Sequence, residues 1–212
     1  LELGCGDGAL WTQNIQFLPQ DISITLSDLS SGMIRDARRA LGRKDKRFSF
    51  EVFDCAKIPH KGCNFDLVIA NHVLFYCEDI PAVCNEIQRV LVPGGKLICS
   101  TYGSHHMQEV SQLVQDFDNR IVLSADRLYE RFGRENGADI LAPYFSDISW
   151  ESYNDSLLVP DAEPLISYIL SCHGNQNQYL LDKYTDFRGF VSRKTKDGFF
   201  ITKDAGIFLC EK

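Results

Sequence analysis

The chain has 212 residues, of which 44% are hydrophobic and 24% are charged. This composition is close to the globular average and excludes a disordered, collagen-like or coiled-coil chain. The 22 Lys and Arg residues are outnumbered by 29 Asp and Glu residues, which gives a net charge of −7. A field of this sign repels polyanions, so we expect no nucleic-acid partner and no binding to anionic membranes. No apolar run approaches the roughly 18 residues that a membrane span needs.

Cysteine usage argues against a disulfide framework or a metal site. The chain has eight cysteines but no Cys-x-x-Cys pair and no zinc-like spacing with histidine. Several lie in apolar segments, such as Cys99, where a free cysteine behaves as a small hydrophobic residue. We therefore expect reduced thiols, no bound metal and a cytoplasmic location. Because the chain opens at Leu1 inside a motif, without an initiator Met, we expect the native protein to extend upstream.

The first hundred residues alternate between strand-like and helix-like patterns. Apolar residues alternate or run continuously in the expected strands, and they recur at helical spacing in the expected helices. The expected strands are 22–27, 48–53, 65–70 and 96–100, and the expected helices are 30–41 and 81–91. This alternation predicts βαβ units and a parallel sheet. In such an open sheet the ligand site lies at the carboxyl ends of the strands.

After Thr101 the pattern becomes mostly helical. We expect helices at 107–117, 124–132, 161–169 and 179–196, and strands at 145–153, 199–201 and 207–210, the last two flanking a turn at 203–206. The prediction is a single domain over residues 1–212, with a cofactor-binding half at 1–101. A helical cap after the fifth strand, at about 103–145 and 161–174, is expected to form the substrate pocket.

A glycine-rich motif, Gly-x-Gly-x-Gly at residues 4–8, follows the first strand. Glycines in this array let the backbone turn tightly and approach a ligand closely. The helix-start amides that follow can face polar groups of that ligand. Alone the motif is weak evidence for a ligand site, because a tight turn in any α/β protein can have the same glycine spacing. It also differs from the dinucleotide fingerprint Gly-x-Gly-x-x-Gly, since Ala9 directly follows Gly8.

Two aspartates end successive strands. Asp28 comes 20 residues after Gly8, where a carboxylate is placed to accept hydrogen bonds from a ribose diol. The alternative is that it caps the helix that starts near Ser30. Asp54 repeats the arrangement after the next strand and could accept from an adenine amino group. A lone aspartate at a strand end is more often a helix cap. Two such aspartates after a glycine loop favour a ligand-binding role.

Five segments together resemble the ordered motifs of class I S-adenosylmethionine-dependent methyltransferases. They are Glu-Leu-Gly-Cys-Gly-Asp-Gly (2–8), Ser-Asp-Leu-Ser (27–30), Phe-Asp-Cys-Ala (53–56), Phe-Asp-Leu-Val-Ile-Ala-Asn-His (65–72) and Val-Pro-Gly-Gly-Lys-Leu (92–97). The resemblance covers about residues 1 to 101. It implies a Rossmann-like, doubly wound α/β fold with a seven-stranded, mostly parallel sheet whose last strand is antiparallel. It also implies S-adenosylmethionine as the cofactor.

The resemblance implies a role for individual residues along the cofactor. From the methionine end to the adenine end these are Glu2, Gly4 and Gly6 at the methionine moiety, Asn71 at the sulfonium, Asp28 at the ribose hydroxyls, and Met33, Asp54, Cys55 and Ala56 at the adenine. The sulfonium is cationic, so an acidic surrounding suits it. Methyl transfer is an in-line displacement from an activated donor, and orientation of the reactants can supply about 7–11 kcal/mol.

Candidate catalytic bases are His72, His105 and His106, because they follow the ends of the fourth and fifth strands. A base is needed only when the acceptor is protonated, and each histidine could instead be structural. Tyr76 and Tyr102 could shape the substrate-binding pocket or belong to the core.

These patterns predict methyl transfer to a small-molecule acceptor. One alternative is an RNA or protein methyltransferase, although the acidic balance disfavours RNA and no Asn-Pro-Pro-Tyr element follows the fourth strand. The other is a non-catalytic module that binds S-adenosylmethionine. The acceptor atom and the oligomeric state stay open.

Overall fold

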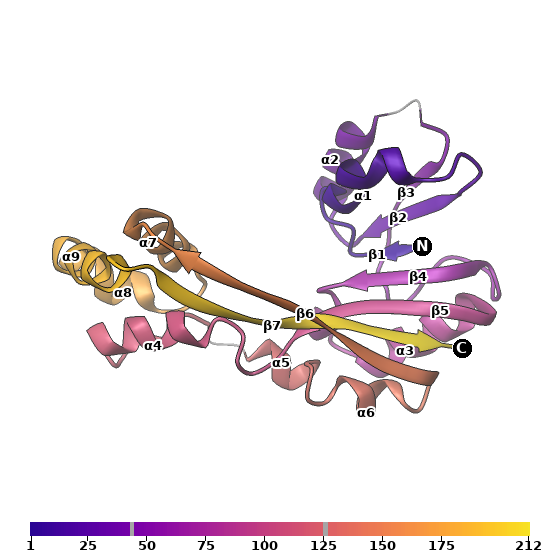
Figure 1. Ribbon diagram of the computed structural model, residues 1–212. Coiled ribbons are helices and arrows are strands. Elements are labelled where there is room, and N and C mark those ends of the chain that lie inside the picture. The colour runs from indigo at the N-terminus through magenta and orange to yellow at the C-terminus, as the bar shows by residue number, and fades with distance from the viewer. Residues whose placement is uncertain (43–44, 125–126) are drawn as a thin grey trace. The chain divides into compact units, whose positions relative to one another are not determined.

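Seven strands lie in the part of the chain that the computed structural model describes, residues 1–42, 45–124 and 127–212 (Figure 1). They are β1 (Glu2–Leu3), β2 (Ile24–Asp28), β3 (Phe48–Val52), β4 (Phe65–Asn71), β5 (Leu91–Tyr102), β6 (Ser146–Val159) and β7 (Phe199–Glu211). They form one sheet in the order β3-β2-β1-β4-β5-β7-β6. The first five strands pair in parallel. The chain thus moves outward from β1 to β3 and then continues on the other side with β4, which is a doubly wound order.

The last strand, β7, runs antiparallel to both of its neighbours. On the β5 side, the Gly94 N–H donates to the Lys212 carbonyl and the Gly103 N–H donates to the Asp204 carbonyl. Residue numbers therefore rise along β5 while they fall along β7. On the β6 side, the Ser146 hydroxyl donates to the Glu211 carbonyl, while Gly206 lies against the Glu151 carbonyl, so residue numbers again run in opposite directions. The predicted seven-stranded α/β sheet, mostly parallel with an antiparallel last strand, is confirmed.

Short helices and turns connect the strands. They are α1 (Ala9–Asn14), η1 (Ile15–Phe17), α2 (Ser31–Leu41), η2 (Leu74–Tyr76), α3 (Ile80–Val90), α4 (Gln108–Phe117), α5 (Leu128–Arg131), α6 (Gly137–Leu141), α7 (Ala162–Ser171), α8 (Gln176–Leu180), η3 (Leu181–Lys183) and α9 (Tyr184–Thr195). None of the described helices has the length and apolar character required to cross a membrane.

Helix α2 shows why the sequence pattern located its elements well. The Ser30 hydroxyl accepts a hydrogen bond from the Met33 N–H at 3.3 Å and so caps the helix start. Ile34, Ala37 and Leu41 recur on one face, and all three are buried in a cluster with residues of β2 and β3. The helix ends at Gly42, whose positive φ of +81° is a conformation that glycine adopts without strain.

Three predicted elements differ from the structure. The predicted helix 179–196 is confirmed only over α9 (Tyr184–Thr195), because its first residues lie in α8 and η3. The predicted turn at 203–206 is wrong, because β7 continues through it from Phe199 to Glu211. Gly206 is required there for close packing and not for a turn: a Cβ on it would meet the Glu151 carbonyl and the Trp150 ring. The predicted helix 124–132 is confirmed only for Leu128–Arg131, and residues 125–126 lie outside the described part.

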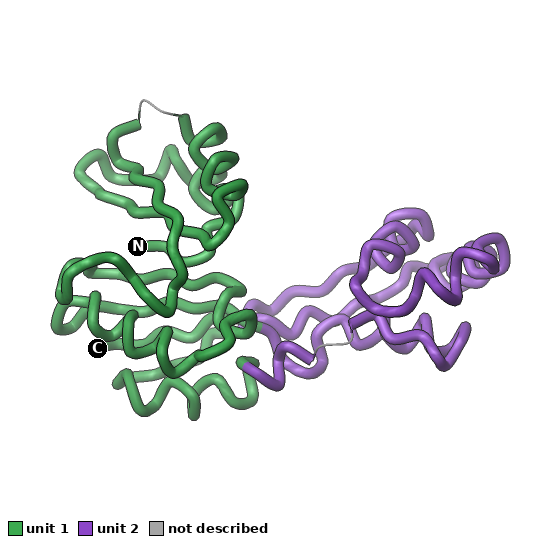
Figure 2. Tube along the Cα trace, turned by 180° about the vertical axis from the view of Figure 1, so that it is seen from behind, with its two compact units in different colours: residues 1–101, 132–151, 206–212 green, residues 102–131, 152–205 purple. Residues whose placement is uncertain are grey.

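The chain divides into two compact units (Figure 2). Unit 1 comprises residues 1–101, 132–151 and 206–212, and unit 2 comprises residues 102–131 and 152–205. Residues 132–145, which we expect in the cap, therefore fall in unit 1. Phe132 is fully buried there, its ring centroid 5.8 Å from that of Phe208. The cap function of 103–145 and 161–174 stays a prediction.

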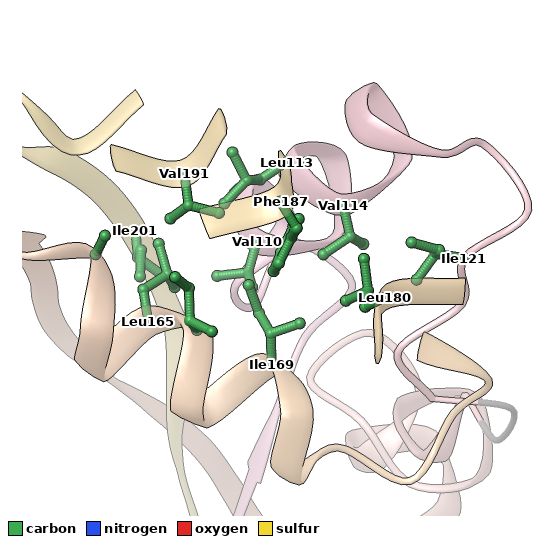
Figure 3. Packing of buried hydrophobic residues seen from close by; sticks show 12 residues of the cluster. Val110, Leu113, Val114, Ile121, Leu165, Ile169, Leu180, Phe187, Val191 and Ile201 are labelled. Atoms are coloured by element: carbon green, nitrogen blue, oxygen red, sulfur yellow. The ribbon is translucent and has the colours of Figure 1, made fainter. Parts of the chain in front are cut away.

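Unit 2 has its own apolar core (Figure 3). Its buried side chains come from α4, α7 and α9, together with single residues outside those helices. They are Val110, Leu113, Val114, Ile121, Ala162, Leu165, Ile166, Ile169, Leu180, Phe187, Val191 and Ile201. The two segments of unit 2, residues 102–131 and 152–205, thus contribute to one shared apolar core.

We expect Ile169→Val to lower the free energy of unfolding by about 0.5–1.5 kcal/mol, because it removes one methyl group from a fully packed site. Ile169 is 0% exposed. Urea denaturation followed by circular dichroism measures the change. Leu158→Val is the matched control, since Leu158 is 67% exposed and its truncation leaves no cavity. An effect at Leu158 equal to that at Ile169 would contradict the assignment of the core.

Candidate functional site

Three glycines of the loop after β1 have left-handed backbone conformations. Their φ angles are +65° at Gly4, +57° at Gly6 and +79° at Gly8. A Cβ on Gly4 would collide with the Val73 side chain, whereas a Cβ on Gly6 would have no atom within 4 Å. Gly4 is therefore required by close packing, and the space beside Gly6 is open to an incoming ligand.

The Asp28 carboxylate at the end of β2 is tied to this loop. Its Oδ2 accepts a hydrogen bond from the Gly6 N–H at 3.0 Å, and its Oδ1 accepts one from the Ser30 N–H at 2.8 Å. The alternative prediction, that Asp28 caps the next helix, is wrong, because the cap of α2 is Ser30. A carboxylate has about four acceptor sites, so Asp28 retains capacity for hydroxyl donors of a ligand.

Asp54 lies in the turn that follows β3. Its Oδ1 accepts a hydrogen bond from the Ala56 N–H at 2.9 Å, and its backbone carbonyl accepts one from the Lys57 N–H at 2.8 Å. These two bonds fix a local turn that includes Cys55. The second carboxylate oxygen of Asp54 is available to a donor such as an amino group.

The end of β4 brings a third segment to the same edge of the sheet. Asn71 is the last residue of β4, and His72 follows it with a φ of +53°. The His72 N–H donates to the carbonyl of Ser100 at 3.2 Å and to its hydroxyl at 3.1 Å. This anchoring turns the chain at the strand end and places Val73 against Gly4.

A cavity of about 660 Å³ in unit 1 lies at these strand ends. Eight of the predicted site residues line it together: Gly4, Asp28, Asp54, Cys55, Ala56, Asn71, His72 and Tyr76. Parallel strands present their carboxyl ends at one edge of the sheet, which explains why residues so far apart in sequence meet here. Glu78 and Asp79 add two carboxylates, and the lining includes neither lysine nor arginine among the described residues. The cavity is therefore acidic and suits a cationic ligand.

Three of the predicted cofactor-binding residues do not line this cavity: Glu2, Gly6 and Met33. Glu2 is only 3% exposed, and its Oε2 accepts a hydrogen bond from the Trp11 indole at 2.5 Å. Burial raises the pKa of the Glu2 carboxyl. Met33 is 45% exposed on α2. Their contacts with a cofactor stay predictions.

The remaining candidates belong to unit 2. Tyr102 and His106 line a cavity of about 580 Å³, with ring centroids 5.1 Å apart, and Tyr129 lies at its wall. His105 is exposed, and its Nδ1 lies 3.8 Å from the Asp204 carboxylate. The structure therefore divides the predicted catalytic and substrate residues between two cavities: His72 and Tyr76 in unit 1, and Tyr102 and His106 in unit 2.

Several lining residues of the unit 1 cavity were missed by the sequence analysis. Leu29 is 74% exposed at its edge and directly follows Asp28, and Phe53 directly precedes Asp54. Their adjacency to the strand-end aspartates was a signal that could have found them. Cys77, Glu78 and Asp79 follow the η2 turn, which has no periodic pattern, so only the fold brings them to the cavity.

Burial of the His72 imidazole affects its titration. Desolvation lowers the pKa of its imidazole. The unfolded chain has the ordinary value of about 6.5, so it takes up a proton first as the pH falls. The stability that neutral His72 contributes is therefore present above about pH 6.5 and is lost as the pH falls from there toward the folded-state pKa.

Between about pH 7 and pH 5, we expect the free energy of unfolding to fall less in His72→Gln than in the wild type, because the variant lacks the imidazole that takes up a proton on unfolding. Urea denaturation at several pH values measures the difference. His173→Gln, at an exposed residue of unit 2, is the control for removing a histidine. Equal pH dependence in His72→Gln and wild type would contradict the desolvation of His72.

The first half of the chain is similar to known methyltransferases. Residues 1–99 match the methyltransferase domain family. The biotin biosynthesis bifunctional protein BioHC of Saccharophagus degradans is 32% identical over 120 residues, which are 57% of this chain and 21% of that protein. The malonyl-[acyl-carrier protein] O-methyltransferase of Hahella chejuensis is 33% identical over 136 residues, covering 61% of this chain and 47% of the relative. The chain thus spans less than half the length of these relatives.

A solved structure shows the same fold over the whole chain. Phosphoethanolamine N-methyltransferase 2 of Haemonchus contortus, in complex with phosphomonomethylethanolamine and S-adenosylhomocysteine, aligns with a TM-score of 0.57 at 19% identity. The alignment covers 100% of this chain and 48% of that one. Residues 1–99 carry a methyltransferase domain, as the motifs that resemble the class I S-adenosylmethionine-dependent family predict. The roles of individual residues stay predictions.

Proposed function

We propose that this methyltransferase domain binds S-adenosylmethionine in the cavity of unit 1 and methylates a small-molecule acceptor. One observation carries the proposal: eight residues predicted from separate motifs surround a single acidic cavity at the strand ends. The glycine loop also leaves room for a ligand beyond the residues that line the cavity, because a Cβ on Gly6 would have no atom within 4 Å.

When bound, S-adenosylmethionine supplies an activated methyl group on a cationic sulfonium. The residues of this chain have the task of binding and orientation. Asp28 accepts hydrogen bonds from ribose hydroxyls with the acceptor sites that Gly6 and Ser30 leave, and the second oxygen of Asp54 accepts from the adenine amino group. The acidic lining lowers the electrostatic energy of a cation in the cavity.

His72 is the proposed general base in unit 1 for an acceptor that carries a proton. Its lowered pKa keeps the imidazole neutral near pH 7, so a ring nitrogen can accept a proton. His105 and His106 are kept as weaker candidates within unit 2. Tyr102 is proposed as a substrate-binding residue there, and residues 103–145 and 161–174 as the acceptor region.

Two observations support a small acceptor. The net charge of −7 disfavours a polyanionic substrate, and the similar solved structure is named for phosphoethanolamine, which is a small molecule. The acceptor is proposed to be uncharged or cationic, because aromatic faces such as that of Tyr76 can hold a cationic amine. A cytoplasmic location belongs to the same proposal and rests on the cysteine usage.

Titration calorimetry with the full chain tests the cofactor assignment. We expect S-adenosylmethionine and S-adenosylhomocysteine to bind and nicotinamide dinucleotides not to bind, because the glycine spacing differs from the dinucleotide fingerprint. Equal binding of a dinucleotide would overturn the assignment. Transfer of a radiolabelled methyl group to metabolite extracts then separates an enzyme from a binding module.

Fluorescence anisotropy with labelled RNA across a salt series tests the small-molecule assignment. Micromolar affinity at about 150 mM salt that weakens steeply as salt rises is the signature of counterion release. Such binding would favour an RNA methyltransferase over the proposed function.

A further inference from the structure

Two cysteines meet at the wall of the unit 1 cavity. Cys55 lies in the turn after β3 and Cys77 directly follows η2, and their Sγ atoms are 3.5 Å apart. Both are partly buried, and both line the cavity. The other six cysteines, which are also free thiols, do not line it: Cys5, Cys63, Cys84, Cys99, Cys172 and Cys210.

We propose that Cys55 and Cys77 form an intramolecular disulfide when a peroxide oxidises the protein, and that this bridge weakens binding of the cofactor. The first half of the proposal concerns only the two thiols. The second half rests on the proposed function, because it requires that the cavity of unit 1 hold S-adenosylmethionine.

The geometry allows the bridge with a small movement. A disulfide bond is about 2.05 Å long, so the two sulfur atoms must approach by about 1.5 Å. Neither cysteine lies within a helix or a strand. The backbone at both positions can therefore shift without breaking the hydrogen-bond ladder of the sheet.

The contact also makes the two thiols chemically unequal. A hydrogen bond from Cys77 lowers the pKa of the Cys55 thiol, and the same contact raises the pKa of Cys77. The thiolate is the reactive form of cysteine, so we take Cys55 as the attacking nucleophile and Cys77 as the resolving thiol, although the bridge between them is the same if the roles are exchanged. Burial raises the pKa of Cys84 and of Cys99, which keeps these thiols of unit 1 protonated.

The reaction with hydrogen peroxide is balanced in two steps. The Cys55 thiolate attacks one peroxide oxygen, the O–O bond breaks, and hydroxide leaves and takes a proton to become water, which leaves Cys55 as a sulfenic acid. Cys77 then loses its proton and attacks the Cys55 sulfur; the S–S bond forms, the S–O bond breaks and a second water leaves. Two thiols have lost two electrons in total, and one peroxide has been reduced to two waters.

The bridge would disturb predicted cofactor contacts directly. Cys55 lies between Asp54 and Ala56, which are joined by the bond from the Ala56 N–H to the Asp54 carboxylate. Drawing Cys55 toward Cys77 moves this turn relative to the adenine position. We expect the affinity for S-adenosylhomocysteine to fall at least about tenfold, which corresponds to the loss of one charge-assisted hydrogen bond.

Binding and oxidation must then be coupled in both directions. Saturating S-adenosylhomocysteine stabilises the dithiol form by the same factor by which the bridge weakens binding. A tenfold difference in affinity raises the midpoint potential of the dithiol–disulfide pair by about 30 mV. Partial protection from oxidation is therefore an independent measure of the same coupling.

The experiment treats the full chain with hydrogen peroxide and maps the products by peptide mass spectrometry under non-reducing conditions. We expect a Cys55–Cys77 cross-linked peptide that dithiothreitol removes. Cys77→Ser cannot form it, whereas Cys63→Ser, which removes an exposed cysteine outside the cavity, is the matched control and keeps it. Calorimetry with S-adenosylhomocysteine before oxidation, after oxidation and after reduction measures the affinity. The affinity of the double variant Cys55→Ser/Cys77→Ser, whatever its value, should no longer respond to peroxide.

The outcomes test separately whether the disulfide forms and whether it weakens binding of the cofactor. If peroxide modifies other cysteines and no Cys55–Cys77 bridge forms, the proposal as a whole is overturned. The wild type and Cys63→Ser are enough to observe this outcome, even if the other variants fail to fold. A bridge that leaves the affinity unchanged overturns the coupling. If the reduced wild type binds no S-adenosylhomocysteine, the proposed function and the coupling fail together, while the mass spectra still decide whether the disulfide forms.

Discussion

Asp28→Ala is expected to weaken the binding of S-adenosylhomocysteine about 10- to 150-fold. The change removes charge-assisted hydrogen bonds to the ribose, which contribute about 1.5–3 kcal/mol. It also frees the Gly6 N–H, which donates to the Asp28 carboxylate at 3.0 Å, so the glycine loop loses its tie to β2. Titration calorimetry on the full chain measures the affinity, and thermal unfolding measures the stability separately.

Two variants separate cofactor binding from helix capping. Asp28→Asn should cost less affinity than Asp28→Ala, because its amide oxygen can still accept one hydrogen bond. Ser30→Ala removes the cap of α2 and should destabilise the protein by about 1 kcal/mol with little change in affinity. If Asp28→Ala instead behaves like Ser30→Ala, Asp28 is a structural residue and does not bind the ribose.

Gly4→Ala is expected to lower the free energy of unfolding by about 2–5 kcal/mol. The left-handed conformation, with φ at +65°, costs a non-glycine residue about 1–2 kcal/mol. The new Cβ also collides with the Val73 side chain, and overpacking of this kind costs about 1–3 kcal/mol. Urea denaturation followed by circular dichroism measures the loss.

Gly6→Ala is the matched control, because it has a similar φ of +57° but no atom within 4 Å of the added Cβ. Its stability loss should be limited to the conformational cost of about 1–2 kcal/mol. The double variant Gly4→Ala/Val73→Ala should recover part of the loss at Gly4 by removing the colliding methyl groups. No difference between Gly4→Ala and Gly6→Ala would contradict the close packing of Gly4 against Val73.

Most of the parallel part of the fold could be predicted from the sequence, because its signals are local. The helix α2 has a serine cap at Ser30 and a glycine at Gly42, and its buried residues recur at helical spacing. The strand ends were marked by Asp28 and Asp54, which is why the cavity contains so many predicted residues. Local periodicity and capping are properties of the chain itself and are visible without its fold.

The features that were missed depend on tertiary contacts. Lys203 to Gly206 has the composition of a turn, but the bond from the Gly103 N–H to the Asp204 carbonyl keeps this segment in the ladder. Ser30 and Asp28 are equally good caps by residue type, and only the backbone conformation decides between them. The meeting of Cys55 with Cys77 joins residues 22 positions apart, which no periodic pattern encodes.

The position of β7 determines how the protein can be shortened. In the sheet β7 lies between β5 and β6, although it is the last strand of the chain. A fragment that stops at residue 101 would keep all the segments that match the family, but the backbone N–H and C=O groups of β5 that face β7 would lose their partners. An unpaired strand edge of this kind recruits other chains and promotes aggregation. We therefore expect the segment with the recognisable motifs to aggregate when it is produced without β7.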